Sequence, residues 1–209
     1  MKNRIQFFEQ MDVYEETEVD CFQNLVISCL NCLGANINLL KLIWPWEFAV
    51  TYLEGEDPVI DEIQHVDAVG IERIADCFQV ESCIFSFEQK NRIESLERIL
   101  ERGQEVFVCL DEFYIPYHYN YIYQKEHGPH TLMLTKIDRE KEEVSCTSSV
   151  PLFKGKIPLS SFNEALYSEH IREWYCTLDY KNLRTQKDCN YGQYIMNIPE
   201  KSKLHKNMF

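Results

Sequence analysis

Glycine is scarce in this chain, with 7 glycines among 209 residues. The closest pair in the sequence, Gly55 and Gly70, is separated by 15 positions. A G-x-G-x-x-G dinucleotide loop or a G-x-x-x-x-G-K-[ST] phosphate loop needs glycines within a few residues of each other. The spacing therefore excludes two large classes of nucleotide-binding protein.

Basic residues are also few: the chain has 21 lysines and arginines and 34 acidic residues, which gives a net charge of −13. A negative protein repels nucleic-acid phosphates and anionic membrane surfaces. The most apolar segment, residues 39–53, contains Lys41, Pro45 and Glu47 and falls short of the roughly 18 apolar residues of a membrane span. We therefore expect neither a nucleic-acid partner nor a membrane partner.

The N-terminal sequence has no apolar core of the kind found in signal peptides, and the nine cysteines are odd in number. These features favour reduced thiols and a cytoplasmic protein. With 45% hydrophobic and 26% charged residues, the composition is that of a globular protein. We expect one domain over residues 1–190 and a C-terminal strand and tail over residues 191–209.

Helical patterns fill the first half of the chain. Apolar residues recur at three- and four-residue steps from position 21 to Gly34, after Asp20, an allowed N-cap residue. Further helices are predicted over parts of three ranges, namely 37–53 with an interruption at Pro45, 69–77, and 91–102, which stops at Gly103.

Strand patterns follow in the second half. Residues 105–110, 131–137 and 143–147 are predicted strands, and the last two form a hairpin across a turn at 138–142. Residues 157–166 indicate a strand end, a cap at Ser160 or Ser161 and a short helix. Helices followed by strands predict an α+β fold with helices packed on an antiparallel sheet.

Cys21 and His130 are the candidate catalytic pair. Cys21 falls at a predicted helix start, where backbone N–H groups and the helix dipole favour a thiolate. His130 opens a predicted strand, which fixes an imidazole in the way that a general base for sulfur requires. The alternative interpretation is that Cys21 is a small core residue of an amphipathic helix.

The segment between these two residues carries a more specific pattern. An apolar strand ends in Asp111, the run Tyr-Ile-Pro-Tyr-His follows at 114–118, and His130 leads the next strand and its hairpin partner. Together with an acidic-Cys helix start, these features span about residues 15–165. They resemble the N-terminal domain of the butirosin-biosynthesis acyltransferase, a branch of the papain-like and bacteriocin-peptidase-like cysteine enzymes.

The resemblance implies a papain-like fold and cysteine-dependent transfer of an acyl group from a carrier-protein thioester to a small-molecule amine in antibiotic-type biosynthesis. Cys21 is then the nucleophile and His130 the base. An acyl carrier protein or a peptide synthetase is the implied partner, and no cofactor is needed. Such a mechanism divides one transfer into two easier steps through an acyl-enzyme.

Two positions depart from the papain-like pattern. Papain-like enzymes have a glutamine that stabilises the oxyanion, and this chain has Glu15 at that position. They also have an Asp or Asn that orients the histidine, and here Thr147 or Ser148 takes that place. Asp111, at the end of the neighbouring strand, is the predicted substitute for that orienting acid. The loop between Asp111 and His130 is expected to line the substrate pocket, with the candidate residues Tyr114, Tyr117 and His118.

Other functions remain open at this point. The same pair serves a cysteine peptidase or amidase, and a non-catalytic member of the fold binds a carrier protein or synthetase instead. A third possibility is a three-histidine metal site made by His118, His127 and His130. Cys29-x-x-Cys32 lacks a second cysteine pair, so we expect no metal there.

The helix-start position of Cys21 gives a prediction about thiol reactivity. We expect iodoacetamide to alkylate Cys21 before the other eight cysteines near neutral pH, and His130→Ala to slow that alkylation. Peptide mapping by mass spectrometry measures the order. Labelling of Cys29 or Cys32 first contradicts the prediction.

Overall fold

A computed structural model describes residues 5–13, 21–35, 48–52, 60–65, 78–87, 91–118, 122–171 and 173–184 of the protein. The contacts within the chain define two compact units. One combines Met1–Gly34 with Ser82–Asp179, and the other combines Ala35–Glu81 with Tyr180–Phe209. The expected division into one domain over residues 1–190 and a tail over 191–209 stays a prediction.

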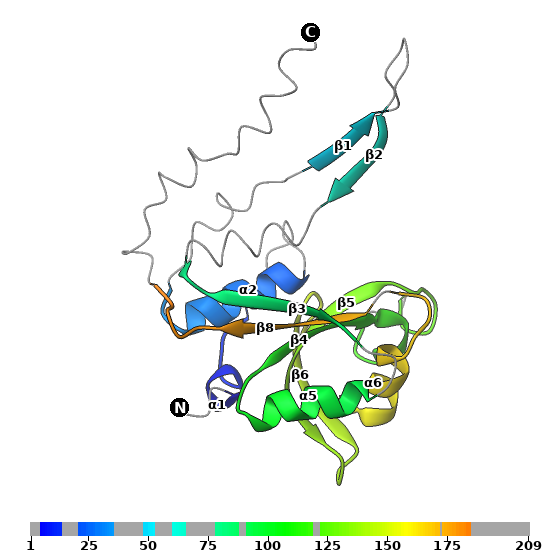
Figure 1. The fold of residues 1–209 in the computed structure, drawn as a ribbon. Helices are drawn as coiled ribbons and strands as arrows, with labels where there is room; N and C mark the ends of the chain where they lie inside the picture. The colour runs from blue at the N-terminus through cyan, green and yellow to red at the C-terminus, as the bar shows by residue number, and fades with distance from the viewer. Residues whose placement is uncertain are drawn as a thin grey trace. The chain divides into compact units, whose positions relative to one another are not determined.

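The first unit is built on a six-stranded sheet with the order β3-β8-β4-β5-β6-β7 (Figure 1). The pairs β8–β4, β4–β5, β5–β6 and β6–β7 are antiparallel. This arrangement confirms the predicted α+β class. The strands are β3 (Glu81–Ser86), β4 (Val106–Asp111), β5 (Pro129–Asp138), β6 (Glu143–Ser149), β7 (Leu152–Pro158) and β8 (Trp174–Asp179).

Helix α2 (Cys21–Cys32) covers one face of this sheet. The Phe22 ring meets the edge of the Phe107 ring at 5.6 Å between centroids, and Cys29 Sγ lies 3.3 Å from Met133 Sδ. Since side chains alternate between the faces of a strand, the residues at odd positions of β4 and at positions 131 and 133 of β5 point toward α2.

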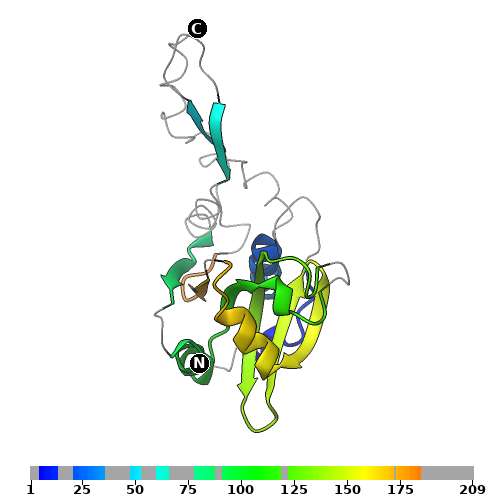
Figure 2. The same cartoon turned by 90° about the vertical axis from the view of Figure 1, so that its right-hand side faces the viewer.

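Helices α5 (Arg92–Glu101) and α6 (Leu159–Leu166) pack on the opposite face (Figures 1 and 2). Their apolar sides meet the residues of β4, β5 and β6 that alternate with the α2-facing ones. This layer is the main hydrophobic core of the unit. It includes the buried side chains of Leu96, Leu100, Val106, Val108, Leu110, Leu132, Leu134, Val144, Cys146, Phe162 and Leu166.

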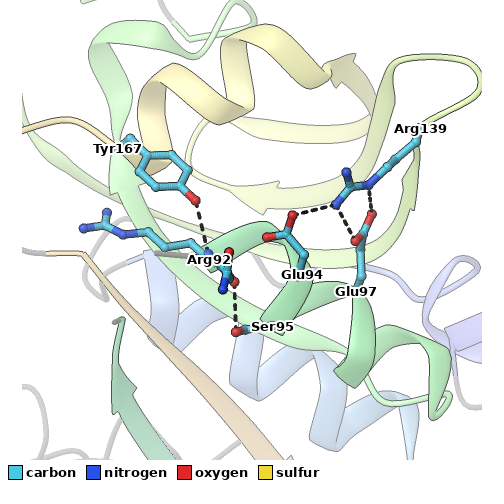
Figure 3. Close-up of polar contacts among 7 residues, drawn as sticks. Arg92, Glu94, Ser95, Glu97, Arg139 and Tyr167 are labelled. Carbon is cyan, nitrogen blue, oxygen red and sulfur yellow. Dashed lines mark hydrogen bonds and ion pairs between the residues drawn. The ribbon is translucent and has the colours of Figure 1, made fainter. Parts of the chain in front are cut away.

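Two arginines attach α5 to its surroundings (Figure 3). The Arg92 guanidinium donates to the carbonyl of Leu166 and lies 3.2 Å from Glu173, while the backbone N–H of Arg92 donates to the Tyr167 hydroxyl at 3.1 Å. Arg139, in the β5–β6 turn, contacts carboxylates of α5 at 2.5–3.2 Å. Figure 3 shows the Tyr167 hydroxyl directed toward the Arg92 backbone and the Arg139 guanidinium directed toward Glu94 and Glu97.

Several elements match the sequence predictions. The structure confirms the helix that begins at Cys21, the helix within 91–102 and the β5–β6 hairpin. The chain leaves α5 at Gly103, whose φ of 74° suits glycine. Helix α6 begins directly after Pro158 rather than at a serine cap.

The helix predicted within 37–53 is wrong where the structure describes that range. Strand β1 (Phe48–Tyr52) pairs antiparallel with β2 (Ile60–His65) in the second unit. The aromatic and β-branched residues of β1 favour extended backbone, and Pro45 prevents a helix from running through into them. The predicted helix at 69–77, the Asp20 cap and the C-terminal strand at 191–209 lie outside the described residues.

The short helix α1 (Ile5–Phe8) precedes α2. Among the described residues, no helix has both the length and the apolar character required to cross a bilayer.

The two arginines of α5 predict different effects on stability. Arg92 and Glu173 have side chains only 14% and 8% exposed, so Arg92→Ala leaves a buried acid without its cation. We expect the free energy of unfolding to fall by about 2–3 kcal/mol. The matched control Arg139→Ala removes an arginine that is 55% exposed and screened by water, and its effect should be small. Urea unfolding monitored by circular dichroism measures both, and an equal loss in the two variants contradicts the prediction.

Candidate functional site

His130 is the second residue of β5 and its side chain is buried. It pairs in register with Leu110, so both side chains belong to the face that carries α5 and α6. His130 Nε2 lies 3.0 Å from Ser148 Oγ and 3.5 Å from the Tyr117 hydroxyl. Residues of β6 and of the loop after β4 thus both approach His130 Nε2.

The surroundings keep His130 neutral. Burial lowers the His130 pKa to about 3, and the charge of neighbouring His118 contributes in the same direction. Its Nε2 atom is engaged by Ser148, which leaves Nδ1 as the nitrogen for a substrate or a nucleophile. A neutral imidazole is the form that accepts a proton or binds a metal.

Cys21 is the first residue of α2 and is partly buried. Its backbone carbonyl accepts a hydrogen bond of 2.9 Å from Ser149 Oγ. Ser149 follows Ser148, which contacts His130. The backbone at the start of α2 therefore lies near the end of β6 that also reaches His130.

The consecutive residues Ser148 and Ser149 connect the two parts of the site. Because they alternate along β6, Ser148 turns toward His130 and Ser149 turns toward the start of α2. Thr147, the other candidate for the orienting position, pairs with Met133 and belongs to the α2 face. Of the two, Ser148 is the residue that contacts the imidazole.

Asp111 has partners other than His130. Its carboxylate accepts hydrogen bonds from Ser168 Oγ at 2.5 Å, from His127 Nδ1 at 2.7 Å and from the backbone N–H of Phe113 at 3.1 Å. Asp111 pairs in register with Pro129 and so points away from the face that carries His130. The expected contact between Asp111 and His130 is not made, and Ser148 holds that place instead.

The hydrogen bonds of Asp111 determine its charge. Burial raises the Asp111 pKa, but the hydrogen bonds from Ser168, His127 and two backbone N–H groups together outweigh burial. The net effect lowers the pKa, so Asp111 is an anion at neutral pH. We interpret Asp111 as the residue that fixes the loop between β4 and β5.

The aromatic loop places two of the three predicted pocket residues beside His130. The Tyr117 ring stacks on Phe153 with centroids 3.8 Å apart, and the His118 ring lies 4.8 Å from that of His130. Tyr114 instead packs against Phe113 at 4.9 Å. Tyr117 and His118 thus lie beside His130, while Tyr114 packs within the loop.

The alternative site of three histidines does not assemble among the described residues. His127 is bound to Asp111, and Glu112 joins His118 and His130 in its place. Sequence reasoning missed Glu112, because only the folded loop brings its carboxylate to His118. Glu15, at the predicted oxyanion position, lies outside the described residues.

Most of the other described thiols are poor nucleophiles. Burial raises the pKa of Cys109, Cys146 and Cys176 to about 12. Burial also raises the pKa of Cys32, and Cys83 is an exposed thiol on β3. Cys83 is therefore the natural internal comparison for Cys21.

Comparison with protein-family models and with curated proteins returns no match. The resemblance to the butirosin-biosynthesis family and the catalytic roles of Cys21 and His130 therefore stay predictions.

The environment of Asp111 predicts a pH dependence of stability. Its folded-state pKa lies below the ordinary 3.8, so its stabilising contribution is complete above that value and is lost as the pH falls through the folded pKa. We expect wild type to exceed Asp111→Asn in unfolding free energy at about pH 5, and this difference to shrink at about pH 3. Chemical denaturation at each pH measures the difference.

A matched control is Asp12→Asn, which changes an exposed aspartate. It should leave the pH profile of stability unchanged. A wild-type advantage over Asp111→Asn that stays constant across this pH range contradicts the assignment.

Proposed function

We propose that the protein transfers an acyl group through a thioester formed on Cys21, with His130 as the general base. One observation carries the proposal: adjacent serines at the end of β6 contact the two residues, Ser148 at the His130 imidazole and Ser149 at the Cys21 backbone. The two serines turn to opposite faces of the sheet, so the Cys21 thiol has to reach His130 around the end of the strand. A thiol at a helix start and a fixed imidazole at the same end of a sheet are the parts that such chemistry needs.

The wider architecture supports the same family. A helix that begins at a cysteine lies on one face of an antiparallel sheet, and a histidine-led strand with its hairpin mate forms the centre of that sheet. We infer a papain-like fold of the butirosin-biosynthesis acyltransferase type. The donor is then a carrier-protein or synthetase thioester and the acceptor a small-molecule amine, in a cytoplasm where the thiols stay reduced.

In the first step the Cys21 sulfur attacks the carbonyl carbon of the donor thioester. The thiol proton passes to His130 Nδ1 as the new carbon–sulfur bond forms. The carbon–sulfur bond of the donor then breaks, and the departing carrier thiolate takes the proton from His130. The products are an acyl-Cys21 thioester and a free carrier thiol.

In the second step the acceptor amine attacks the acyl-Cys21 carbonyl. His130 accepts a proton from the amine nitrogen and returns it to the Cys21 sulfur as the thioester breaks. The amide leaves and the enzyme is regenerated, so atoms and charges balance over the two steps. When water replaces the amine, the same pair hydrolyses the thioester, which is the peptidase-like alternative.

The lowered His130 pKa shapes this mechanism. Burial opposes an imidazolium, so the resting state contains a thiol and a neutral imidazole rather than an ion pair. Ser148 orients the His130 ring but has no negative charge with which to stabilise the imidazolium that forms when His130 accepts a proton. We therefore expect slow turnover compared with an enzyme whose histidine is supported by a carboxylate.

The same two features favour a second candidate function. A neutral Ser148 and a buried, weakly basic His130 suit a non-catalytic member of the fold that binds a carrier protein or a synthetase. In that case Tyr117 and His118 contact the bound partner and no acyl-enzyme forms.

Intact-mass spectrometry after incubation with acyl-N-acetylcysteamine thioesters tests the proposal. We expect a single acyl adduct on wild type, none on Cys21→Ser, and acylation slowed by roughly 10²–10⁴-fold in His130→Ala. Ser148→Ala should slow single-turnover acylation more than Asp111→Asn, because Ser148 contacts the imidazole and Asp111 does not.

The matched control is Cys83→Ser, which removes an exposed thiol on β3 and should acylate at the wild-type rate. Incubation with a small-molecule amine acceptor separates transfer from hydrolysis, because transfer yields the amide and hydrolysis yields the free acid. If wild type forms no adduct with any thioester, or only an adduct on Cys83, the enzyme proposal fails and the binding function remains.

A further inference from the structure

A second chemical arrangement overlaps with this site. One donor atom from each of Glu112, His118 and His130 lies within 4.8 Å of the others. His118 Nε2 is 3.3 Å from Glu112 Oε2, and the rings of His118 and His130 meet at 79°. Both histidines are buried and Glu112 is half-buried. Three side chains able to bind a metal thus converge from a loop and a strand.

Backbone hydrogen bonds fix the loop that carries two of these side chains. The short helix η1 (Glu112–Tyr114) begins the loop, and the N–H of Glu112 donates to the Gly128 carbonyl at 2.9 Å. The N–H of Ile115 donates to the Glu112 carbonyl at 3.0 Å, and the N–H of His118 donates to the Ile115 carbonyl at 3.1 Å. Two consecutive turns therefore bring His118 back to the start of β5.

Gly128 leaves the space that the Glu112 carboxylate occupies. A Cβ atom at position 128 would lie 2.4 Å from Glu112 Oε1, which is closer than the two atoms can approach. A larger residue at position 128 thus forces the Glu112 carboxylate to shift. The absence of a side chain here is a second, independent feature of the arrangement.

The charges around Glu112 favour a cation. Asp111 and Glu126 are close enough to Glu112 for their negative charges to act on its carboxylate. A divalent cation at this point compensates negative charge and binds neutral imidazoles at once.

We propose that Glu112, His118 and His130 form a zinc site. Two imidazole nitrogens and one carboxylate oxygen are a common set of zinc ligands, with a fourth position open to water or substrate. Donor atoms around tetrahedral zinc lie about 3.4 Å apart. The His118–Glu112 pair already has this spacing, and small side-chain rotations bring His130 to it.

Ser148 gives this site a further characteristic of metal centres. A histidine that binds zinc commonly has its other ring nitrogen held by a hydrogen bond, which fixes the orientation of the ring. Ser148 Oγ lies 3.0 Å from His130 Nε2, so Nδ1 is the metal-binding nitrogen of His130.

The zinc site does not depend on the proposed acyl transfer, but the two exclude each other at any moment. A His130 nitrogen that donates its electron pair to zinc cannot accept the proton of Cys21. Bound metal therefore switches off the chemistry that requires His130 as a base.

Titration of the metal-free full-length protein with Co²⁺, a spectroscopic substitute for zinc, tests the site. We expect one Co²⁺ per chain, with visible ligand-field bands and without the near-ultraviolet absorption that thiolate ligands produce. His118→Ala and Glu112→Gln should each weaken binding by roughly 100-fold or more, since each removes a ligand. Gly128→Ala should weaken it too, by displacing Glu112.

The matched control is His170→Ala, which removes an exposed histidine outside the cluster and should leave Co²⁺ affinity unchanged. Circular dichroism verifies folding, and Glu112→Gln decides the outcome if His118→Ala does not fold. Absence of binding, a thiolate charge-transfer band, or affinity unchanged in both ligand variants overturns the proposal. Alkylation of Cys21 in metal-free protein tests the acyl-transfer proposal separately, so the failure of one is distinct from the failure of the other.

Discussion

The alternation of side chains along the central strands is the constraint on which the site depends. Because Leu110 pairs with His130 and Asp111 pairs with Pro129, the histidine and the aspartate point to opposite faces of the sheet. The same alternation sends Ser148 and Ser149 in opposite directions. A shift of one residue in the pairing of β4 with β5 would exchange the partners of His130 and Asp111.

This constraint explains why one end of the sheet carries two separate polar groups. Asp111, His127 and Ser168 form a network in which the carboxylate is saturated with hydrogen bonds, and such a network rigidifies a loop. His130 has a hydroxyl partner and buried surroundings, which leave it neutral and one nitrogen available. Of the two groups, the second has the properties of a reactive site.

Local patterns allowed the sequence to predict much of the first unit. The amphipathic spacing after Cys21, the helix that stops before Gly103 and the hairpin of β5 with β6 all depend on contacts between residues close in sequence. The strand of residues 48–52 was mistaken for helix because short apolar runs suit both structures. Its β-branched and aromatic residues were the better guide.

The partners of the site residues could be predicted only in part, because they depend on register between strands joined by a long loop. Nothing in the local sequence fixes whether Asp111 lies opposite Pro129 or opposite His130. The hairpin between β5 and β6 has a short turn, and counting along it did identify Ser148 as one of two candidates for the contact with His130. The sequence did not reveal Glu112, because only the folded loop between β4 and β5 brings it to His118.

The burial of His130 affects the two proposed functions in opposite ways. A low-dielectric setting disfavours the imidazolium, which weakens His130 as a base for Cys21. For a metal ligand the same setting is favourable, because a histidine binds metal in its neutral form and no proton then competes near neutral pH. A carboxylate in place of Ser148 would stabilise the imidazolium and so favour acyl transfer. The neutral hydroxyl that this chain has instead orients the ring without supporting its charge, which makes His130 better suited to holding a cation than to becoming one.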